Sequence, residues 1–195
     1  MSEQSALAFR KLVAAMRTTQ KEYWAHREKR VLKQSIELEK RVDDTIMKAD
    51  ASAVPQNDNG NFFLLVAELR ATTKQYFSEK KKPQPDKDLV RDLFTTIKEK
   101  EAKVDKQLIR FQDEDIRKQG YCIQYHVFER PRKCPAHSVF DSTDEQLAQI
   151  MYNNYLRSPS APGTMYFMMK KYIGNDGMPI PPEEIDKIIN NNSNS

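Results

Sequence analysis

Glycine and cysteine are scarce in this sequence, and long apolar runs are absent. Only 5 glycines occur in 195 residues, and no G-x-G-x-x-G or Walker pattern is present, which argues against a glycine-rich phosphate-binding loop. The 2 cysteines indicate a reducing compartment. The longest apolar runs, FFLLVA and TMYFMM, are much shorter than the roughly 20 residues that a helix needs to span a bilayer. The N-terminus lacks the apolar stretch of a signal peptide, so we expect a soluble protein of the cytoplasm.

Charged residues, in contrast, are abundant. They make up 31% of the chain, whereas hydrophobic residues make up 38%. This composition is lean for one thick core and suits helices that each bury a single apolar stripe. The net charge of +4 permits contact with nucleic acid or an acidic partner without requiring it.

One line of sequence is written twice. FRKLVAAMRTTQKEYW at 9–24 returns as FFLLVAELRATTKQYF at 62–77, and half of the positions are identical. A second match joins ELEKRVDDTI at 37–46 to EKEAKVDKQL at 99–108, after an insertion that coincides with prolines in KKKPQPDKD. The chain therefore contains an internal repeat. The identical pairs of the first match are Phe9 and Phe62, Leu12 and Leu65, Val13 and Val66, Ala14 and Ala67, Arg17 and Arg70, Thr19 and Thr72, Lys21 and Lys74, and Tyr23 and Tyr76.

The repeat predicts a mainly α fold, built from a duplicated antiparallel helical-hairpin or coiled-coil unit over residues 5–118. Its two copies cover about 5–50 and 62–118, separated by a loop at 49–61 that we expect to break the helix through Asp58 and Gly60. The proline-bearing insertion predicts a turn between two helices in the second copy. The matching segment of the first copy, AHREKR, contains no turn residue, so that copy is either a hairpin or one long helix. Such hairpins bury their stripes by packing on each other or on another copy.

A small α+β or irregular C-terminal module is predicted over residues 120–190. YCIQYHVFE at 121–129 alternates like a strand, and AHSVF is a candidate for a second short strand. STDEQLAQIMYNNYLRS opens with capping-box spacing and predicts a helix to about residue 157. TMYFMMKKYI is an element of uncertain type, PPEEIDKII predicts a final helix, and 190–195 predicts a disordered tail.

Both cysteines and two of the three histidines fall within one short stretch, as Cys122, His126, Cys134 and His137. Zinc takes four such ligands in a tetrahedral array, which makes this cluster a zinc candidate and zinc the one cofactor considered. Against it, the spacing fits no common finger template, and the strand rise would hold Cys122 roughly 13 Å from His126. The alternative is a small hairpin with a half-buried cysteine and exposed histidines. No residue orients a Cys134–histidine pair for nucleophilic catalysis, so we expect no enzyme and no catalytic residue.

The repeated basic residues form the second candidate site. Arg17 with Lys21, and Arg70 with Lys74, lie one helical turn apart beside a repeated tyrosine (Tyr23 or Tyr76). Such faces are suited to binding the phosphates of a nucleotide or a nucleic acid. The alternative is that the tyrosines edge the core and the basic side chains extend over them. We interpret the acidic residues of these helices, Asp43, Asp105 and those of DEDIRK at 113–118 among them, as solvated faces with ion pairs along the helix.

A Met-rich and aromatic segment forms the third candidate site. Its side chains either fold back onto the helices or make a partner interface, because Met-rich apolar surface adapts to irregular partners. The residues concerned are Met165, Tyr166, Phe167, Met168, Met169 and Tyr172.

The line F-x-x-LVA-x-x-R-x-T-x-K-x-Y, followed by an ELEKRVD-like helix, resembles small uncharacterised helical-hairpin proteins of gut-bacterial phages and mobile elements. The resemblance covers residues 9–46 and 62–109. It implies a phage or mobile-element origin, and with it the cytosol of a bacterial host or a virion, but no activity and no functional residue. We therefore expect a non-enzymatic interaction protein that forms homo-oligomers, as a structural component or a binder of a host factor. The alternative is a phosphate-ligand binder for nucleic acid or nucleotide.

Overall fold

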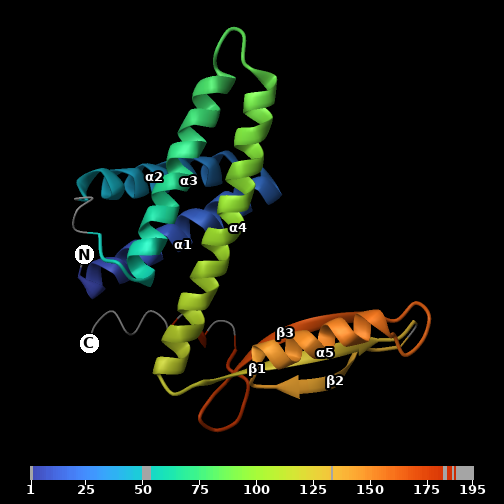
Figure 1. The fold of residues 1–195 in the computed structure, drawn as a ribbon. Helices are drawn as coiled ribbons and strands as arrows, with labels where there is room; N and C mark the ends of the chain where they lie inside the picture. Colours follow the sequence, from blue (N-terminus) through green and yellow to red (C-terminus); the bar gives the residue numbers. More distant parts are fainter. Residues whose placement is uncertain (1, 50–53, 133, 182–183, 186, 188–195) are drawn as a thin grey trace. The chain divides into compact units, whose positions relative to one another are not determined.

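The computed structural model of the chain describes residues 2–49, 54–132, 134–181, 184, 185 and 187. It divides into two compact units, Met1–Arg110 and Phe111–Ser195. The first is helical and the second contains a small sheet (Figure 1), which confirms the predicted mainly α fold with a small α+β module. The predicted tail at 190–195 lies outside the described residues. None of the described helices is long and apolar enough to cross a membrane.

The first copy of the repeat is a hairpin of α1 (Glu3–His26) and α2 (Lys29–Lys48), which pack against each other (Figure 1). Arg27 ends α1 in the left-handed conformation, with φ 59°, and its backbone N–H donates to the carbonyl of Tyr23. Glycine usually occupies such a position after a helix. Because an arginine occupies it here, no turn residue marks the hairpin in the sequence.

The second copy is a hairpin of α3 (Asp58–Lys80) and α4 (Lys87–Lys118). The two helices lie side by side (Figure 1), and Glu68 on α3 pairs with Lys100 on α4. The carboxylate of Glu79 accepts a hydrogen bond from the backbone N–H of Asp86 at 3.2 Å, and so ties the end of α3 to the start of α4. The predicted proline-bearing turn is confirmed.

Helix α3 begins earlier than the sequence indicated. Asp58 and Gly60 lie in its first turn, so the expectation that they break the helix is wrong. The side chain of Asn57 caps the helix by accepting a hydrogen bond from the N–H of Gly60 at 3.0 Å. A Cβ at Gly60 would lie 1.7 Å from the carbonyl oxygen of Pro55, so glycine serves here to let another backbone segment approach.

The two hairpins cross (Figure 1), and equivalent residues of the two copies form the core. The ring of Phe9 on α1 lies 5.0 Å from that of Phe63 and 6.2 Å from that of Phe62, both on α3. The hairpins thus bury their apolar stripes against each other, as expected for units that are not stable alone. The buried apolar pairs are Phe9 and Phe62, Val13 and Val66, Met16 and Leu69, Val31 and Leu93, and Val42 and Val104.

The second unit is built on a three-stranded antiparallel sheet of order β2-β1-β3. Its strands are β1 (Cys122–Arg130), β2 (His137–Ser142) and β3 (Met165–Ile173), and α5 (Glu145–Arg157) follows β2. Both predicted strands are confirmed, and the element of uncertain type is a strand. Asp144 caps α5 by accepting hydrogen bonds from two backbone N–H groups.

Alternate residues of the strands point to a core on one face of the sheet. Packing of α5 and of the last turns of α4 against this face buries side chains from each element. The opposite face carries Phe128 and Phe167, whose rings stack 5.3 Å apart across β1 and β3. One face of the sheet is therefore covered and the other is more exposed. The buried residues of this core are Ile116, Ile123, Tyr125, Ala148 and Tyr172.

Candidate functional site

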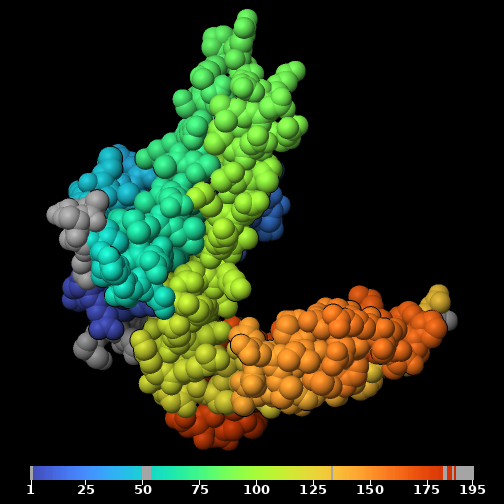
Figure 2. All heavy atoms as spheres, in the orientation of Figure 1, coloured from blue at the N-terminus to red at the C-terminus, as the bar shows by residue number. Residues whose placement is uncertain are grey.

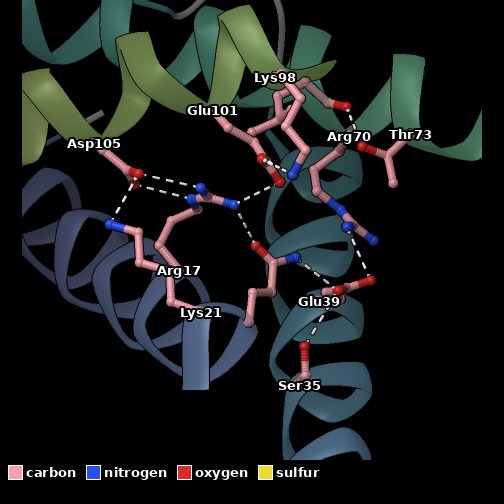
Figure 3. A network of polar contacts seen from close by, with 11 residues as sticks. Arg17, Lys21, Ser35, Glu39, Arg70, Thr73, Lys98, Glu101 and Asp105 are labelled. Carbon is pink, nitrogen blue, oxygen red and sulfur yellow. Dashed lines mark hydrogen bonds and ion pairs between the residues drawn. The ribbon is translucent and has the colours of Figure 1, made fainter. Parts of the chain in front are cut away.

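The repeated arginine of the first copy lies inside the helical unit. Arg17 on α1 is 5% exposed. Its Nε and Nη2 donate to the two carboxylate oxygens of Asp105 on α4, at 2.9 and 3.1 Å, and its Nη1 donates to Glu101 at 2.8 Å. Lys21, one turn further on, contacts the same Asp105 at 2.9 Å (Figure 3). Arg17 is therefore the centre of an ion cluster between the two hairpins.

The second copy repeats this geometry. Arg70 on α3 is 7% exposed and donates to both carboxylate oxygens of Asp43 on α2, at 2.8 and 3.1 Å. It also pairs with Glu39 at 3.0 Å, and Lys74 pairs with Asp43 at 3.0 Å. A guanidinium suits this position because its planar fork binds a carboxylate through two parallel hydrogen bonds.

The two clusters are reciprocal. The first helix of each copy supplies the cations, and the second helix of the other copy supplies the carboxylates. Each copy thus neutralises the buried charges of the other, in the way that two subunits meet across a two-fold interface. This arrangement gives a physical reason for the duplication, since a single hairpin would leave its arginine and its carboxylates without partners.

Gln20 joins the two clusters into one network. Its amide oxygen accepts from Arg17 at 2.7 Å, and its amide nitrogen donates to Glu39 at 2.7 Å. The equivalent residue of the second copy, Thr73, instead donates to the carbonyl of Leu69 in its own helix. The network is therefore continuous on one side of the repeat only.

The clusters shift the pKa values of their members. Burial alone would raise the pKa of Asp105, but hydrogen bonds from Arg17 and Lys21 outweigh it and lower that pKa below its ordinary value. Asp43 has the same opposing causes, with Arg70 and Lys74 as donors, and its pKa is also lowered. These carboxylates remain charged in the folded protein at neutral pH, which keeps the cross-hairpin pairs intact.

The geometry bears directly on the predicted phosphate-binding faces. The donors of Arg17 and Arg70 are directed at carboxylates, so a phosphate would have to displace them. Lys21 and Lys74 are 62% and 58% exposed and remain accessible to solvent. The phosphate-binding role of these faces stays a prediction, with the internal carboxylates as its competitors.

The acidic residues of these helices differ from the sequence-based interpretation. Asp43 and Asp105 were expected on solvated faces, and this is wrong because they bind arginines of the other hairpin. It is also wrong for Asp113, which is 7% exposed and accepts hydrogen bonds from Lys170 at 2.7 Å and Tyr172 at 2.9 Å. A signal was present in the sequence, because Asp43 and Asp105 directly follow the repeated core valines.

The zinc candidates do not form one cluster in the described part of the chain. Cys122 and Cys134 are exposed and free, and no group of three or more His, Cys, Asp or Glu side chains among the described residues could hold a metal ion. His126 lies on β1 and His137 on β2. In the register of these strands, His126 is opposite Asp141 and His137 is opposite Glu129. Cys122 and His126 both lie on strand β1, as expected from the sequence.

A polar group on the sheet was not anticipated. Nδ1 of His126 lies 2.5 Å from the carboxylate of Asp141, which also accepts a hydrogen bond from Ser138 at 2.5 Å. The hydrogen bond from Ser138, followed by that from His126, lowers the pKa of Asp141. The pairing of β1 with β2 creates this group, so neither segment indicates it alone.

The structure divides the predicted Met-rich interface between two faces. Tyr166 and Tyr172 are each 8% exposed and turn toward the covered face, with Met168 beside the core. Met165 and Met169 are 64% and 45% exposed and lie on the other face. Alternate residues of β3 thus lie on the covered face and on the exposed face, and a partner interface at the exposed residues stays a prediction. The face formed by Met165, Phe167, Met169 and Phe128 is called the open sheet face below.

The helical network and the open sheet face are the two arrangements into which the structure brings most of the predicted site residues. No family model, curated protein or solved structure matches the chain. The interpretation therefore depends on the geometry of the described residues.

Proposed function

We propose that this protein is a non-enzymatic interaction protein that self-associates through strand β3 and the open sheet face. The observation that carries the proposal is the exposure of Met165 and Met169, at 64% and 45%, on a strand at the edge of the sheet. Exposed apolar side chains beside the open edge of a strand are typical of an interaction surface.

The edge of β3 supports pairing with another strand. Among the described residues, its outer side is bridged only near its end, where Ile173 pairs with Pro179. An edge strand presents backbone N–H and C=O groups that can form hydrogen bonds with a strand of another chain. Edge strands that stay alone are usually short or protected by charge or proline. β3 is 9 residues long, and its two lysines, Lys170 and Lys171, lie in its second half, so its first half carries neither charge nor proline.

A second copy of the chain is the occupant that fits best. Two β3 strands related by a two-fold axis would pair antiparallel, and each would meet the same residues on its partner. On the open sheet face, Met165 and Met169 of one copy would then be cross-strand neighbours of β3 side chains of the other copy, which covers part of their apolar surface. The resemblance of the repeat to helical proteins of phages and mobile elements would make such an oligomer a structural component or a binder of a host factor.

The helical unit supports a structural rather than a chemical role for the repeated charges. Its two most buried cationic side chains, Arg17 and Arg70, bind carboxylates of the same chain. In this proposal the crossed hairpins serve as a rigid body that the sheet unit links to its partner copy.

The proposal is tested by native mass spectrometry of the full chain and of Met165→Lys with Met169→Lys. We expect a dimer or larger oligomer for the wild type and a monomer for the double variant. Met178→Lys is the matched control, because Met178 is also 64% exposed but lies outside β3. A wild-type monomer at every concentration, or an oligomer that the double variant leaves intact, would contradict the proposal.

A further inference from the structure

A trio of side chains, a half-buried tyrosine with an exposed aromatic ring and an exposed cation, occurs at the end of both hairpins. In the first copy it is Tyr23, Trp24 and Arg27, and in the second copy it is Tyr76, Phe77 and Lys80, at equivalent positions of the repeat. The two aromatic rings of each trio contact each other, with centroids 5.7 Å apart in the first and 5.1 Å apart in the second. These two sets are called the hairpin-end trios.

Packing within the chain leaves one ring of each trio largely exposed. Trp24 is 58% exposed and Phe77 is 50% exposed, whereas most other matching residues of the repeat form the core or the ion clusters. Large apolar rings in contact with water are unfavourable for the isolated protein. Their presence at the same place in both copies therefore points to a contact made with another molecule.

Cations accompany the rings in both copies. The guanidinium carbon of Arg27 lies 4.0 Å from the ring centre of Trp24, and Nζ of Lys80 lies 5.4 Å from that of Tyr76. The second hairpin extends the pattern with Phe94, which is 48% exposed and has Nζ of Lys98 5.5 Å from its ring centre. Each hairpin end thus offers an aromatic face beside a positive charge.

Further exposed cations surround both trios. The first hairpin end adds three near Glu22 and Glu28, and the second adds three more near Glu79, Asp86, Asp88 and Asp92, with Lys82 paired to Glu79 at 2.6 Å. Figure 2 shows the end of the α3–α4 hairpin reaching beyond α1 and α2, with its surface open on the side in view. Phosphates can therefore approach these cations. The added cations are Lys29, Arg30 and Lys33, and Lys81, Lys82 and Lys87.

We propose that the two hairpin-end trios bind single-stranded nucleic acid. Unpaired bases stack on Trp24 and Phe77, and the adjoining phosphates contact Arg27 and Lys80. Stacking on aromatic rings within a basic groove or patch is the usual mode of sequence-tolerant single-strand binding. A membrane surface is a poorer fit because insertion favours a broad apolar face, whereas each trio offers two rings among charged residues. Two such sites on one chain also raise affinity for a strand that reaches both.

Trp24 makes the proposal directly measurable, because it is the only tryptophan in the chain. Titration of the full chain with oligo-dT is expected to quench its fluorescence, since a base stacks on the ring itself. The affinity, followed in parallel by anisotropy of a labelled oligo-dT, is expected to fall as salt rises, with a slope of about 0.7 per phosphate contact.

Variants separate the stacking contribution from the charge contribution. Phe77→Ala is expected to weaken binding about tenfold through the loss of one stacked base. Arg27→Asn with Lys80→Gln is expected to reduce the salt slope, and asparagine is chosen because it tolerates the left-handed conformation of residue 27. Leu64→Ala is the matched control, since Leu64 lies on the same helix as Phe77 and is 49% exposed.

Four outcomes decide the matter. Quenching by oligo-dT, together with loss of affinity in Phe77→Ala but not in Leu64→Ala, supports the proposal. Binding that Phe77→Ala leaves unchanged overturns it, because the rings would then not be the binding surface. A response to duplex DNA alone overturns the single-strand assignment. A blue shift with phosphatidylserine vesicles, without any response to oligo-dT, overturns it in favour of a membrane surface.

Discussion

The two ion clusters share the same ion pairs but have different neighbours. In the Arg17 cluster, Glu101 has a second cation, Lys98, at 2.8 Å. In the Arg70 cluster, the equivalent carboxylate is Glu39. Among the described residues Arg70 is the one cation that contacts Glu39, which also accepts hydrogen bonds from Ser35 and Gln20. The position equivalent to Lys98 in the first copy is an isoleucine. The comparison indicates that the reciprocal pairs hold the hairpins together, whereas their supporting residues have diverged and make the clusters unequal.

Acid is expected to have the largest effect, because it acts on both clusters at once. Hydrogen bonds from arginine and lysine overcome the effect of burial and lower the folded-state pKa values of Asp43 and Asp105. Their contribution to stability is complete above the unfolded value of about 3.9 and is lost as the pH falls through the folded values. We expect the free energy of unfolding, measured with urea and far-ultraviolet circular dichroism, to drop steeply below about pH 4.

The double variant Asp43→Asn with Asp105→Asn serves as the control for this prediction. It is expected to be less stable at neutral pH and to have a shallower acid dependence, because two of the groups that titrate have been removed. An acid dependence as steep as that of the wild type would show that other carboxylates are responsible.

Single substitutions of the two arginines test the inequality of the clusters. Arg70→Ala is expected to cost about 3 kcal/mol, the lower end of the range for breaking a buried pair, because Glu39 is left without a cation. Arg17→Ala is expected to cost less, about 2 kcal/mol, since Lys21 and Lys98 still neutralise its carboxylates. Urea unfolding at neutral pH measures both values. Equal costs, or a larger cost for Arg17→Ala, would refute the inequality.

Much of the fold could be predicted from the sequence, because it depends on local patterns. The apolar spacing from Phe9 to Met16 and the proline-bearing insertion predict helices and a turn, and the alternation in β1 predicts a strand. The turn at Arg27 could not be predicted, because that residue adopts a conformation that is usual for glycine. The start of α3 was misplaced because Gly60 permits a close backbone approach rather than breaking the helix.

The candidate sites were harder to predict, because their partners are distant in the sequence. Repetition marked Arg17 and Arg70 as important but did not identify their partners, which lie on the other hairpin. A basic residue beside an apolar stripe is compatible with a ligand site and with a buried ion pair. Only the crossing of the hairpins distinguishes a ligand site from a buried ion pair, and this crossing depends on tertiary packing. The group around His126 depends in the same way on strand pairing.

Gln20 provides a smaller test of the comparison. Gln20→Ala removes the hydrogen bonds to Arg17 and Glu39 and is expected to cost about 1 to 2 kcal/mol. Thr73→Ala, at the equivalent position of the second copy, removes one bond within its own helix and is expected to cost less than about 0.5 kcal/mol. Thermal unfolding followed by circular dichroism compares the two. A similar cost for both would mean that the link between clusters does not stabilise the protein.

The two lysines are expected to have the smallest and most equal effects. Lys21 and Lys74 are largely exposed and contact their aspartates at 2.9 and 3.0 Å, so each alanine variant is expected to cost about 0 to 1 kcal/mol, less at high salt. The effect of Lys74 should grow in an Arg70→Ala background, because it becomes the remaining cation at Asp43. A double-mutant cycle measures this coupling. Additive effects would show that Lys74 is merely a solvated neighbour, whereas coupling would show that it belongs to the cluster that holds the hairpins together.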